Sequence, residues 1–214
     1  MDLKDLRNEY SQGTLDVADM DPSPFKQFET WFEQARAAGF SPDPSAMVIA
    51  TVCPNGQPHQ RMVLLKELDD TGFVFYTNLE SRKGREIKDN AQVSLHFPWH
   101  PIERQVSVSG EVEPIDRGAA EAYFQSRPRG SQVAAWASRQ SHRIDSRADL
   151  ETAFEQAEAR FAGQDVLPLP DFWGGYRVVP HRIEFWQGRR SRMHDRLVYQ
   201  RQGAQHWTLE RLQP

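Results

Sequence analysis

Cysteine is almost absent from this sequence, since Cys53 is the only one among 214 residues. A single cysteine excludes an intrachain disulfide and a zinc cage built from several cysteines. No apolar run reaches membrane-spanning length, and no segment has the pattern of a signal peptide. A glycine-rich phosphate loop and histidines spaced with carboxylates as metal ligands are missing as well. These absences predict a cytoplasmic protein that has no membrane segment and binds no metal.

Strong charge of either sign is also lacking. Lysine and arginine number 26 against 30 aspartates and glutamates, which leaves a net charge of −4. Because no basic stripe is present, we expect no nucleic-acid partner. Aromatic residues are plentiful, with six tryptophans and twelve phenylalanines, and they suit a core, an interface or a surface on which a flat ligand stacks.

The order of patterns predicts a mobile, polar arm over residues 1–23, including a short helix at 3–10, and a single domain over 24–214. Helices are expected at 24–38, 81–89, 118–125, 131–138 and 146–161. Strands are expected at 46–52, 60–66, 73–77, 92–97, 104–112, 176–179, 182–187, 195–200 and 206–212. The fold class is therefore mainly β with α additions: a small, antiparallel, Greek-key-like barrel flanked by helices.

The start of the helix at 81–89 has the features of an anion site. Ser81 occupies the N-cap position, and Arg82 and Lys83 follow in the first turn. Cations are unfavourable there unless an anion lies among them, because the helix start already carries partial positive charge. Arg61, on a neighbouring predicted strand, could add a third cation. A solvated basic surface would show the same spacing.

A second candidate anion site follows the predicted helix at 118–125. Tyr123, Arg127 and Ser131 are spaced by four residues, so a guanidinium and two hydroxyls could converge on one phosphate. A solvated helix end is the alternative.

A third cluster lies near the C-terminus. If 192–196 is a strand, Arg192, His194 and Arg196 share one face, and Trp186 lies on the preceding strand of the same hairpin. Three such groups favour an anionic or π-rich ligand opposite them. The exposed face of an edge strand would look the same.

Eight motifs, in this order along almost the whole chain, resemble those of the pyridoxamine 5′-phosphate oxidase family. They are QRMVLLK (60–66), FYTNLESRK (75–83), FPWHPIERQV (97–106), YFQSRPRGSQ (123–132), RQSHRI (139–144), PDFWGGYRV (170–178), EFWQG (184–188) and RMHDR (192–196). No single motif is specific for this family, but eight motifs in the same order are.

The resemblance implies an FMN-binding split β-barrel that forms a homodimer, with FMN at the subunit interface. The residues that it implies as FMN contacts are Arg61, Met62, Val63, Leu64, Leu65, Lys66, Tyr76, Thr77, Arg82, Lys83, Gln105, Gln140, Ser141, Trp186 and Arg196. The residues that it implies as substrate contacts are Lys66, Tyr123, Arg127, Ser131, Arg192, His194, Arg7 and Tyr10, of which Arg192 and His194 would be catalytic.

The implied activity is the FMN-dependent oxidation of pyridoxamine 5′-phosphate and pyridoxine 5′-phosphate to pyridoxal 5′-phosphate, with O₂ reduced to hydrogen peroxide. Alternatives are another split-barrel flavin reductase and a non-enzymatic protein that binds flavin or pyridoxal phosphate. One conflict remains within the sequence: strict alternation puts Arg61 and Lys66 on opposite faces of a regular strand, unless the strand bends.

Overall fold

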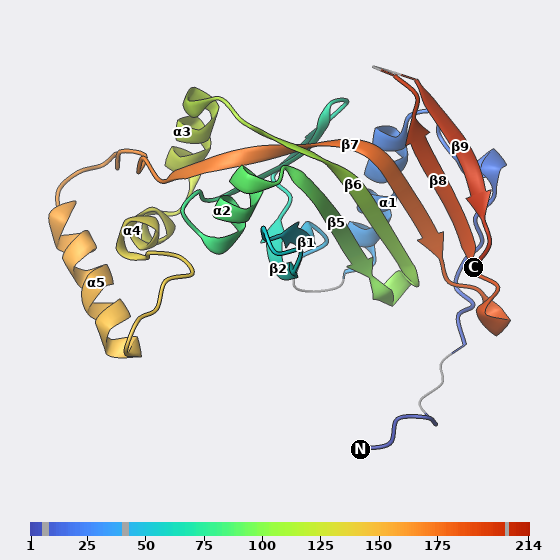
Figure 1. The fold of residues 1–214 in the computed structure, drawn as a ribbon, viewed down its shortest axis with the longest axis horizontal. Helices are drawn as coiled ribbons and strands as arrows, with labels where there is room; N and C mark the ends of the chain where they lie inside the picture. The colour runs from blue at the N-terminus through green and yellow to red at the C-terminus, as the bar shows by residue number, and fades with distance from the viewer. Residues whose placement is uncertain (6–8, 40–42, 204–205) are drawn as a thin grey trace.

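The computed structural model describes residues 1–5, 9–39, 43–203 and 206–214. In this part of the chain, nine antiparallel strands form one sheet, with helices against it and at one end (Figure 1). The strands are β1 (Ala46–Val52), β2 (Pro58–Leu64), β3 (Glu67–Asp69), β4 (Gly72–Asn78), β5 (Gln92–Trp99), β6 (Arg104–Pro114), β7 (Trp173–Gln187), β8 (Asp195–Arg201) and β9 (Trp207–Leu212). The helices are α1 (Pro24–Ala37), α2 (Arg82–Asp89), α3 (Arg117–Ser126), α4 (Arg129–Ala137) and α5 (Arg147–Arg160), with 3₁₀ turns η1 (Val17–Asp19), η2 (His100–Ile102) and η3 (Arg190–Arg192). The predicted class, mainly β with added helices, is confirmed.

Strand β7 runs across the whole molecule and joins its parts (Figure 1). It pairs with β6 along most of its length, with β4 over its first half and with β8 over its second half. The sheet order is β2-β1-β5-β6-β7-β4-β3, and β8 and β9 extend from β7. A single strand therefore holds both ends of the molecule in a fixed relation.

The prediction of two separate strands at 176–179 and 182–187 is wrong, because both belong to β7. Pro180, which has no N–H group to donate to a strand ladder, lies between them. It lies opposite Gly110, where the β6–β7 register shifts between Ser109 and Gly110. An irregularity of this kind accommodates a proline inside a strand, so the chain continues without a break.

Helix α1 forms where the sequence predicts it. Ser23 caps its start by accepting a hydrogen bond from the Lys26 N–H, and Pro24 occupies the first turn. Phe28 and Trp31 are 1% and 3% exposed and pack into the main core between α1 and the sheet.

A second hydrophobic cluster lies where α3, α4 and α5 meet the start of β7. Phe124, Phe161, Leu167 and Trp173 are buried in it. Because Phe185, near the other end of β7, belongs to the main core, one strand links the two clusters. The single domain predicted for 24–214 stays a prediction that this continuity supports. Among the described residues, every helix is too short or too polar to traverse a bilayer.

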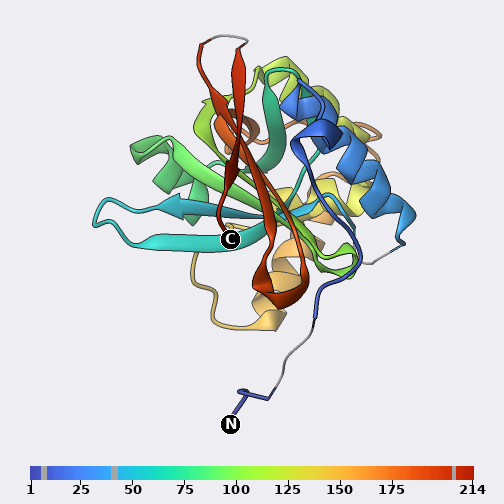
Figure 2. The same cartoon turned by 90° about the vertical axis from the view of Figure 1, so that its right-hand side faces the viewer.

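The part of the N-terminal segment that precedes η1 runs beside the β8–β9 hairpin, whereas residues 1–5 extend away from the body of the protein (Figure 2). Leu15 is 4% exposed and belongs to the main core. The N–H groups of Ser11 and Gln12 donate to the carboxylate of Glu103 at 2.7 and 2.8 Å. One apolar side chain and two backbone groups of this segment therefore have partners on the body, and the mobile arm predicted for 1–23 stays a prediction. The helix predicted at 3–10 lies partly outside the described residues, and residues 3–5 and 9–10 are not helical.

The prediction that Arg192, His194 and Arg196 share a strand face is wrong. Arg190–Arg192 forms the 3₁₀ turn η3, and β8 begins only at Asp195. Ser191 and Arg192 have φ angles of 56° and 60°, in the left-handed region. The chain reverses there between β7 and β8, so the alternation of side chains along a strand does not apply before Asp195.

We expect Gly110→Ala to destabilise the protein. A Cβ atom at this position would lie 2.4 Å from the carbonyl oxygen of Val179, so the β6–β7 pairing would have to shift. Overpacking of this kind costs on the order of 1–3 kcal/mol, which would appear as a lower midpoint in urea denaturation. Gly130→Ala is the control: its Cβ would meet nothing within 4 Å, and alanine favours helix α4. Equal midpoints for Gly110→Ala and the unmodified protein would contradict the argument.

Candidate active site

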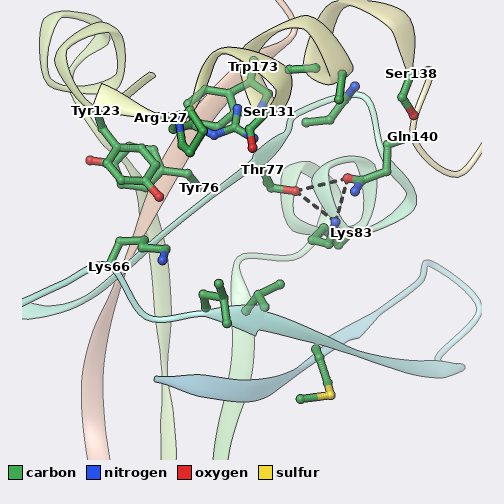
Figure 3. Close-up of a pocket in the computed structure, with 17 residues that line it drawn as sticks. Lys66, Tyr76, Thr77, Lys83, Tyr123, Arg127, Ser131, Ser138, Gln140 and Trp173 are labelled. Carbon is green, nitrogen blue, oxygen red and sulfur yellow. Dashed lines mark hydrogen bonds between the residues drawn. The ribbon is translucent and has the colours of Figure 1, made fainter. Parts of the chain in front are cut away.

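A cavity of about 520 Å³ lies between β2, β4, α2 and the α3–α4 region (Figure 3). Many residues predicted for the site share its walls. These are Met62, Val63, Leu64, Lys66, Tyr76, Thr77, Lys83, Tyr123, Arg127, Ser131 and Gln140. The cavity therefore brings together residues that come from distant parts of the sequence.

Lys83 marks one side of the cavity. Its ammonium group donates to Thr77 Oγ1 and Gln140 Oε1, both at 2.9 Å (Figure 3). It also donates to Ser81 Oγ at 3.3 Å. Ser81 also caps α2 by accepting from the Gly84 N–H, as predicted. All three partners of Lys83 are neutral oxygens, and no carboxylate of the described residues contacts it.

The charge of Lys83 is therefore poorly compensated. The side chain is almost completely buried, with 6% of the residue exposed. Burial first, and then the charge of Arg61, lower its pKa from the ordinary value to about 8. A buried ammonium group at a helix start, with a second cation nearby, fits a bound anion such as phosphate.

The other two predicted cations differ in their surroundings. Arg61 is partly buried on β2, and its guanidinium contacts Thr51 and Glu86. Arg82 is exposed at the first position of α2. Neither belongs to the cavity walls, although the effect of Arg61 on Lys83 shows that the two charges are close.

The conflict between Arg61 and Lys66 is resolved by a break in the strand. Strand β2 ends at Leu64, and β3 begins at Glu67. The Lys66 N–H donates to the carbonyl of Val74 at 2.8 Å, while its side chain lines the cavity. Leu65 points the other way, into the main core. The chain thus bends between the two residues, and both can serve adjoining sites.

Aromatic rings and Arg127 mark the opposite side of the cavity (Figure 3). Tyr76 and Tyr123 are stacked with ring centroids 3.9 Å apart, and Trp173 lies nearly parallel to Tyr76 at 5.6 Å. The guanidinium carbon of Arg127 lies 4.9 Å from the Trp173 ring centroid. Ser131 follows on α4, so the predicted cluster of Tyr123, Arg127 and Ser131 does form part of one wall.

Arg127 has an unmet hydrogen-bonding capacity. Its Nη1 atom is the one buried side-chain nitrogen or oxygen of the described residues that has no hydrogen-bond partner. Burial lowers the pKa of this guanidinium, and the Tyr123 hydroxyl offsets part of that effect. Buried donors are normally satisfied, so this atom indicates a missing acceptor in the cavity. An anionic oxygen would satisfy the donor and offset the desolvated charge.

The remaining predicted residues form a separate group on the β7–β8 hairpin. His194 packs against Trp186 at 4.6 Å between ring centroids, and Tyr10 from the N-terminal segment packs against both rings. The Arg189 N–H donates to His194 Nδ1, so this nitrogen is an acceptor. Burial and the charge of Arg192 lower the pKa of His194, which favours the neutral ring. Arg192 itself is exposed.

Three predicted residues lie in one row across three strands. Gln105 on β6 is opposite Trp186 on β7, which in turn is opposite Arg196 on β8. Arg196 donates to Glu184 at 2.7 Å. None of these residues lines the cavity, and neither do Arg192 and His194. Within one chain, the predicted site is thus divided into two groups.

Ser141 does not line the cavity and is exposed, with a φ of 69°, next to Gln140. Arg7 lies outside the described residues.

Reasoning from the sequence missed Trp173 and Glu86. Trp173 belongs to the PDFWGGYRV motif, but the sequence assigned it no contact, although its place between two predicted site segments was a usable signal. Glu86 lies one turn after Arg82 and Lys83, so helical spacing could have placed a carboxylate near these cations.

The prediction of no metal site can be compared with one group of potential ligands. Among the described residues, Cys53, His59 and Glu86 bring a thiol, an imidazole and a carboxylate within 4.8 Å of one another. Both carboxylate oxygens of Glu86 already accept hydrogen bonds or ion pairs from protein groups. We therefore interpret Glu86 as the centre of a hydrogen-bonded cluster.

Taken together, the continuous antiparallel sheet and the cation-lined cavity define a split-barrel protein whose cavity fits phosphorylated ligands. Two family models match the chain, "Pyridoxamine 5'-phosphate oxidase" over residues 33–161 and "Pyridoxine 5'-phosphate oxidase C-terminal dimerisation region" over residues 173–214. The chain belongs to the pyridoxamine 5′-phosphate oxidase family.

Full-length relatives agree with this membership. The chain is 55% identical over 214 residues, covering 100% of both chains, to a pyridoxine/pyridoxamine 5′-phosphate oxidase of Pseudoalteromonas translucida. It is also 55% identical over 213 residues to the protein of the same name from Shewanella oneidensis, covering 100% of this chain and 99% of that one.

Solved structures confirm the split-barrel fold. PhzG of Burkholderia lata, in complex with tetrahydrophenazine-1-carboxylic acid, is 29% identical with a TM-score of 0.86, covering 94% of this chain and 98% of its own. A pyridoxamine 5′-phosphate oxidase-related, FMN-binding protein from Nostoc punctiforme is 20% identical with a TM-score of 0.72, covering 91% of this chain and 100% of its own, which supports the fold alone.

Proposed function

We propose that this protein oxidises pyridoxamine 5′-phosphate and pyridoxine 5′-phosphate to pyridoxal 5′-phosphate, with FMN as cofactor. When bound, FMN supplies the two-electron acceptor chemistry, and O₂ takes up the electrons to give hydrogen peroxide. The amine substrate also consumes one water molecule and releases ammonia. Its family membership and its 55% identity to named oxidases support this function.

The observation that carries the proposal is the unpartnered, buried Nη1 of Arg127 opposite the poorly compensated Lys83. One cavity thus has two positions that each require an anion. FMN and a pyridoxine phosphate each bring one phosphate group. A split-barrel flavin reductase would need only the first position, so the second favours a phosphorylated substrate.

The donors around Lys83 fit the phosphate of FMN. In the proposed complex, Lys83, Arg61 and Arg82 bind this phosphate, with Thr77 close by, and Tyr76 contacts FMN from the other side of the cavity. The backbone of 61–66 borders the flavin ring. Residues proposed to complete the FMN site are Gln105, Gln140, Ser141, Trp186 and Arg196.

The opposite side of the cavity fits the substrate phosphate. Arg127 donates to it together with the hydroxyls of Tyr123 and Ser131, and Lys66 adds a second positive charge. Stacking of Tyr76 on Tyr123 restricts both rings and so holds one of these donors in place. Binding the phosphate away from the reacting carbon orients the substrate ring for reaction.

Arg192 and His194 are the proposed catalytic residues at the pyridine ring. Arg192 would orient the ring and stabilise negative charge that develops on it. His194, kept neutral by burial and by the Arg192 charge, would hold a ring substituent through a hydrogen bond. Tyr10 contacts His194, so the N-terminal segment, with Arg7, is proposed to border the substrate.

The division of the site supports a homodimer with FMN at the subunit interface. The hairpin carrying Trp186, Arg192, His194 and Arg196 does not line the cavity of its own chain. A second copy could supply that hairpin. Met62, at the cavity wall, is 61% exposed, as expected for a residue that a ligand or partner covers. A cytoplasmic location stays a prediction, supported by the single cysteine.

An absorption spectrum tests the function. We expect the purified protein to be yellow and to bleach when pyridoxamine 5′-phosphate is added without oxygen. Admission of air should restore the colour and release hydrogen peroxide. Unphosphorylated pyridoxamine is the matched control and should reduce the flavin far more slowly, because it leaves Arg127 unsatisfied. A yellow protein that does not bleach would indicate a flavin-binding protein without this activity.

The pKa of Lys83 predicts a proton uptake on FMN binding. Near pH 8.5 this amine is largely neutral in the flavin-free protein, since its pKa is about 8. A phosphate beside it favours the charged form, so the complex holds more protons than the free protein and FMN affinity falls as the pH rises above 8. Isothermal titration in buffers of different ionisation enthalpy measures the uptake. Lys83→Met should abolish it, and Lys88→Met, on the exposed side of α2, should not. Equal uptake in both variants would remove Lys83 from the phosphate site.

We expect Arg192→Ala to lower turnover by about 10²–10³-fold while FMN remains bound, because the variant loses a charge that acts on the reacting ring. Steady-state peroxide release and the flavin content of the purified variant measure the two effects. Arg190→Ala, in the same 3₁₀ turn, is the control and should retain turnover. Turnover of Arg192→Ala close to that of the control would exclude the catalytic role.

A further inference from the structure

Glu86 is a buried carboxylate next to the proposed FMN phosphate site. It lies on α2, one turn after Lys83, and only 5% of the residue is exposed. Its Oε1 atom lies 2.7 Å from His59 Nδ1. Its Oε2 atom accepts from the Thr51 hydroxyl at 2.5 Å and faces Arg61 Nη2 at 3.3 Å. Side chains from two strands, β1 and β2, therefore converge on this one carboxylate of α2.

Thr51 completes a closed arrangement with Glu86 and Arg61. Its hydroxyl is fully buried on β1, donates to Glu86 and accepts from Arg61 Nη1 at 2.5 Å. The guanidinium is thus held at both terminal nitrogens. A guanidinium has five N–H donors, so others remain for an anion.

The contacts of Arg61 with Thr51 and Glu86 counteract the electrostatic repulsion between the Arg61 and Lys83 cations. Arg61 and Lys83 are close enough for Arg61 to lower the pKa of Lys83. Without an attractive partner, a long arginine side chain would turn away from a second buried cation. Burial alone would raise the pKa of Glu86, but hydrogen bonds from Thr51 and His59 and the charge of Arg61 hold it below the ordinary value. Glu86 therefore stays ionised and attracts Arg61 at neutral pH.

We propose that Glu86 is a positioning residue for FMN binding: with Thr51, it holds the Arg61 guanidinium beside Lys83, ready for the flavin phosphate. The inference rests on the proposed function, since it takes Arg61 as a phosphate ligand. Glu86 does not contact the phosphate itself, because like charges would repel. Glu86 affects FMN affinity only by fixing the position of the Arg61 guanidinium.

Two substitutions of Glu86 separate geometry from charge. Glu86→Ala removes the contact to Arg61, and we expect the dissociation constant of FMN to rise about tenfold, equivalent to about 1.4 kcal/mol. Glu86→Gln keeps an oxygen for Arg61 and Thr51 and presents an N–H to His59, so we expect an affinity within about threefold of the unmodified protein. Quenching of flavin fluorescence measures both constants. A loss in Glu86→Gln as large as in Glu86→Ala would overturn the positioning role.

A double-mutant cycle tests whether the effect runs through Arg61. In an Arg61→Ala background, Glu86→Ala should change FMN affinity by less than about twofold, because there is no guanidinium left to position. If Glu86 had only a structural role, Glu86→Ala would weaken FMN binding as much in the Arg61→Ala background as in the unmodified protein. Thr51→Val, which is nearly isosteric, should also weaken FMN binding, and only when Arg61 is present. It replaces Glu86→Ala in the cycle if that variant does not fold. His59→Ala is the matched control, since it removes the partner of the other oxygen, and FMN affinity should stay within about twofold.

The outcomes separate this inference from the proposed function. If Arg61→Ala weakens FMN binding and neither Glu86→Ala nor Thr51→Val does, the positioning role is wrong and the phosphate site stands. If Arg61→Ala leaves FMN binding unchanged, Arg61 is not a phosphate ligand and both assignments are wrong. A loss that persists fully in the Arg61→Ala background also overturns the positioning role.

Discussion

The antiparallel pairing along β7 is the constraint on which the rest of the structure depends. Its first half pairs with β4 and brings Trp173 next to Tyr76 and Arg127. Its second half pairs with β8 and brings Trp186 next to Arg196. Because backbone hydrogen bonds set both registers, the spacing between the cavity and the C-terminal hairpin cannot vary without breaking the sheet. The proposed homodimer, with its site divided over two chains, would need this rigidity, since each half would have to meet its counterpart at a fixed distance.

Uncompensated positive charge is the second organising feature. Folding buries Lys83 and part of Arg127 among neutral oxygens and aromatic rings, which is unfavourable for the protein alone. Such strain is typical of binding sites, where the ligand supplies what the fold lacks. Arg61 differs, because its guanidinium already contacts Glu86 and Thr51 in the ligand-free protein. The site thus combines two cations that lack a charged partner among the described residues, Lys83 and Arg127, with a third, Arg61, whose side chain is already held in position by protein groups.

A similar arrangement recurs at the hairpin. Glu184 is 9% exposed and accepts from Arg196 and from Arg182, both at 2.7 Å. Arg196, like Arg61, therefore forms an ion pair with a buried carboxylate. Pairs of this kind add little net stability when buried, but they restrict a flexible side chain to one orientation. In a site that must recognise two phosphorylated rings, the loss of arginine freedom on folding reduces the entropy lost on binding.

The sequence by itself determined the local elements and the chemistry of the site. Helix α1, the Ser81 cap and the cluster of Tyr123, Arg127 and Ser131 follow from spacing, because caps and helical faces depend on neighbours within one or two turns. The ordered motifs were sufficient to indicate the family. Only the tertiary structure decided that Pro180 lies inside a strand, that Arg192 lies in a left-handed turn and that Leu15 anchors the N-terminal segment. It also decided that Glu86 meets Arg61, and that the site is divided into two groups. Each of these depends on contacts between residues far apart in the chain, and spacing along the sequence carries no information about such contacts.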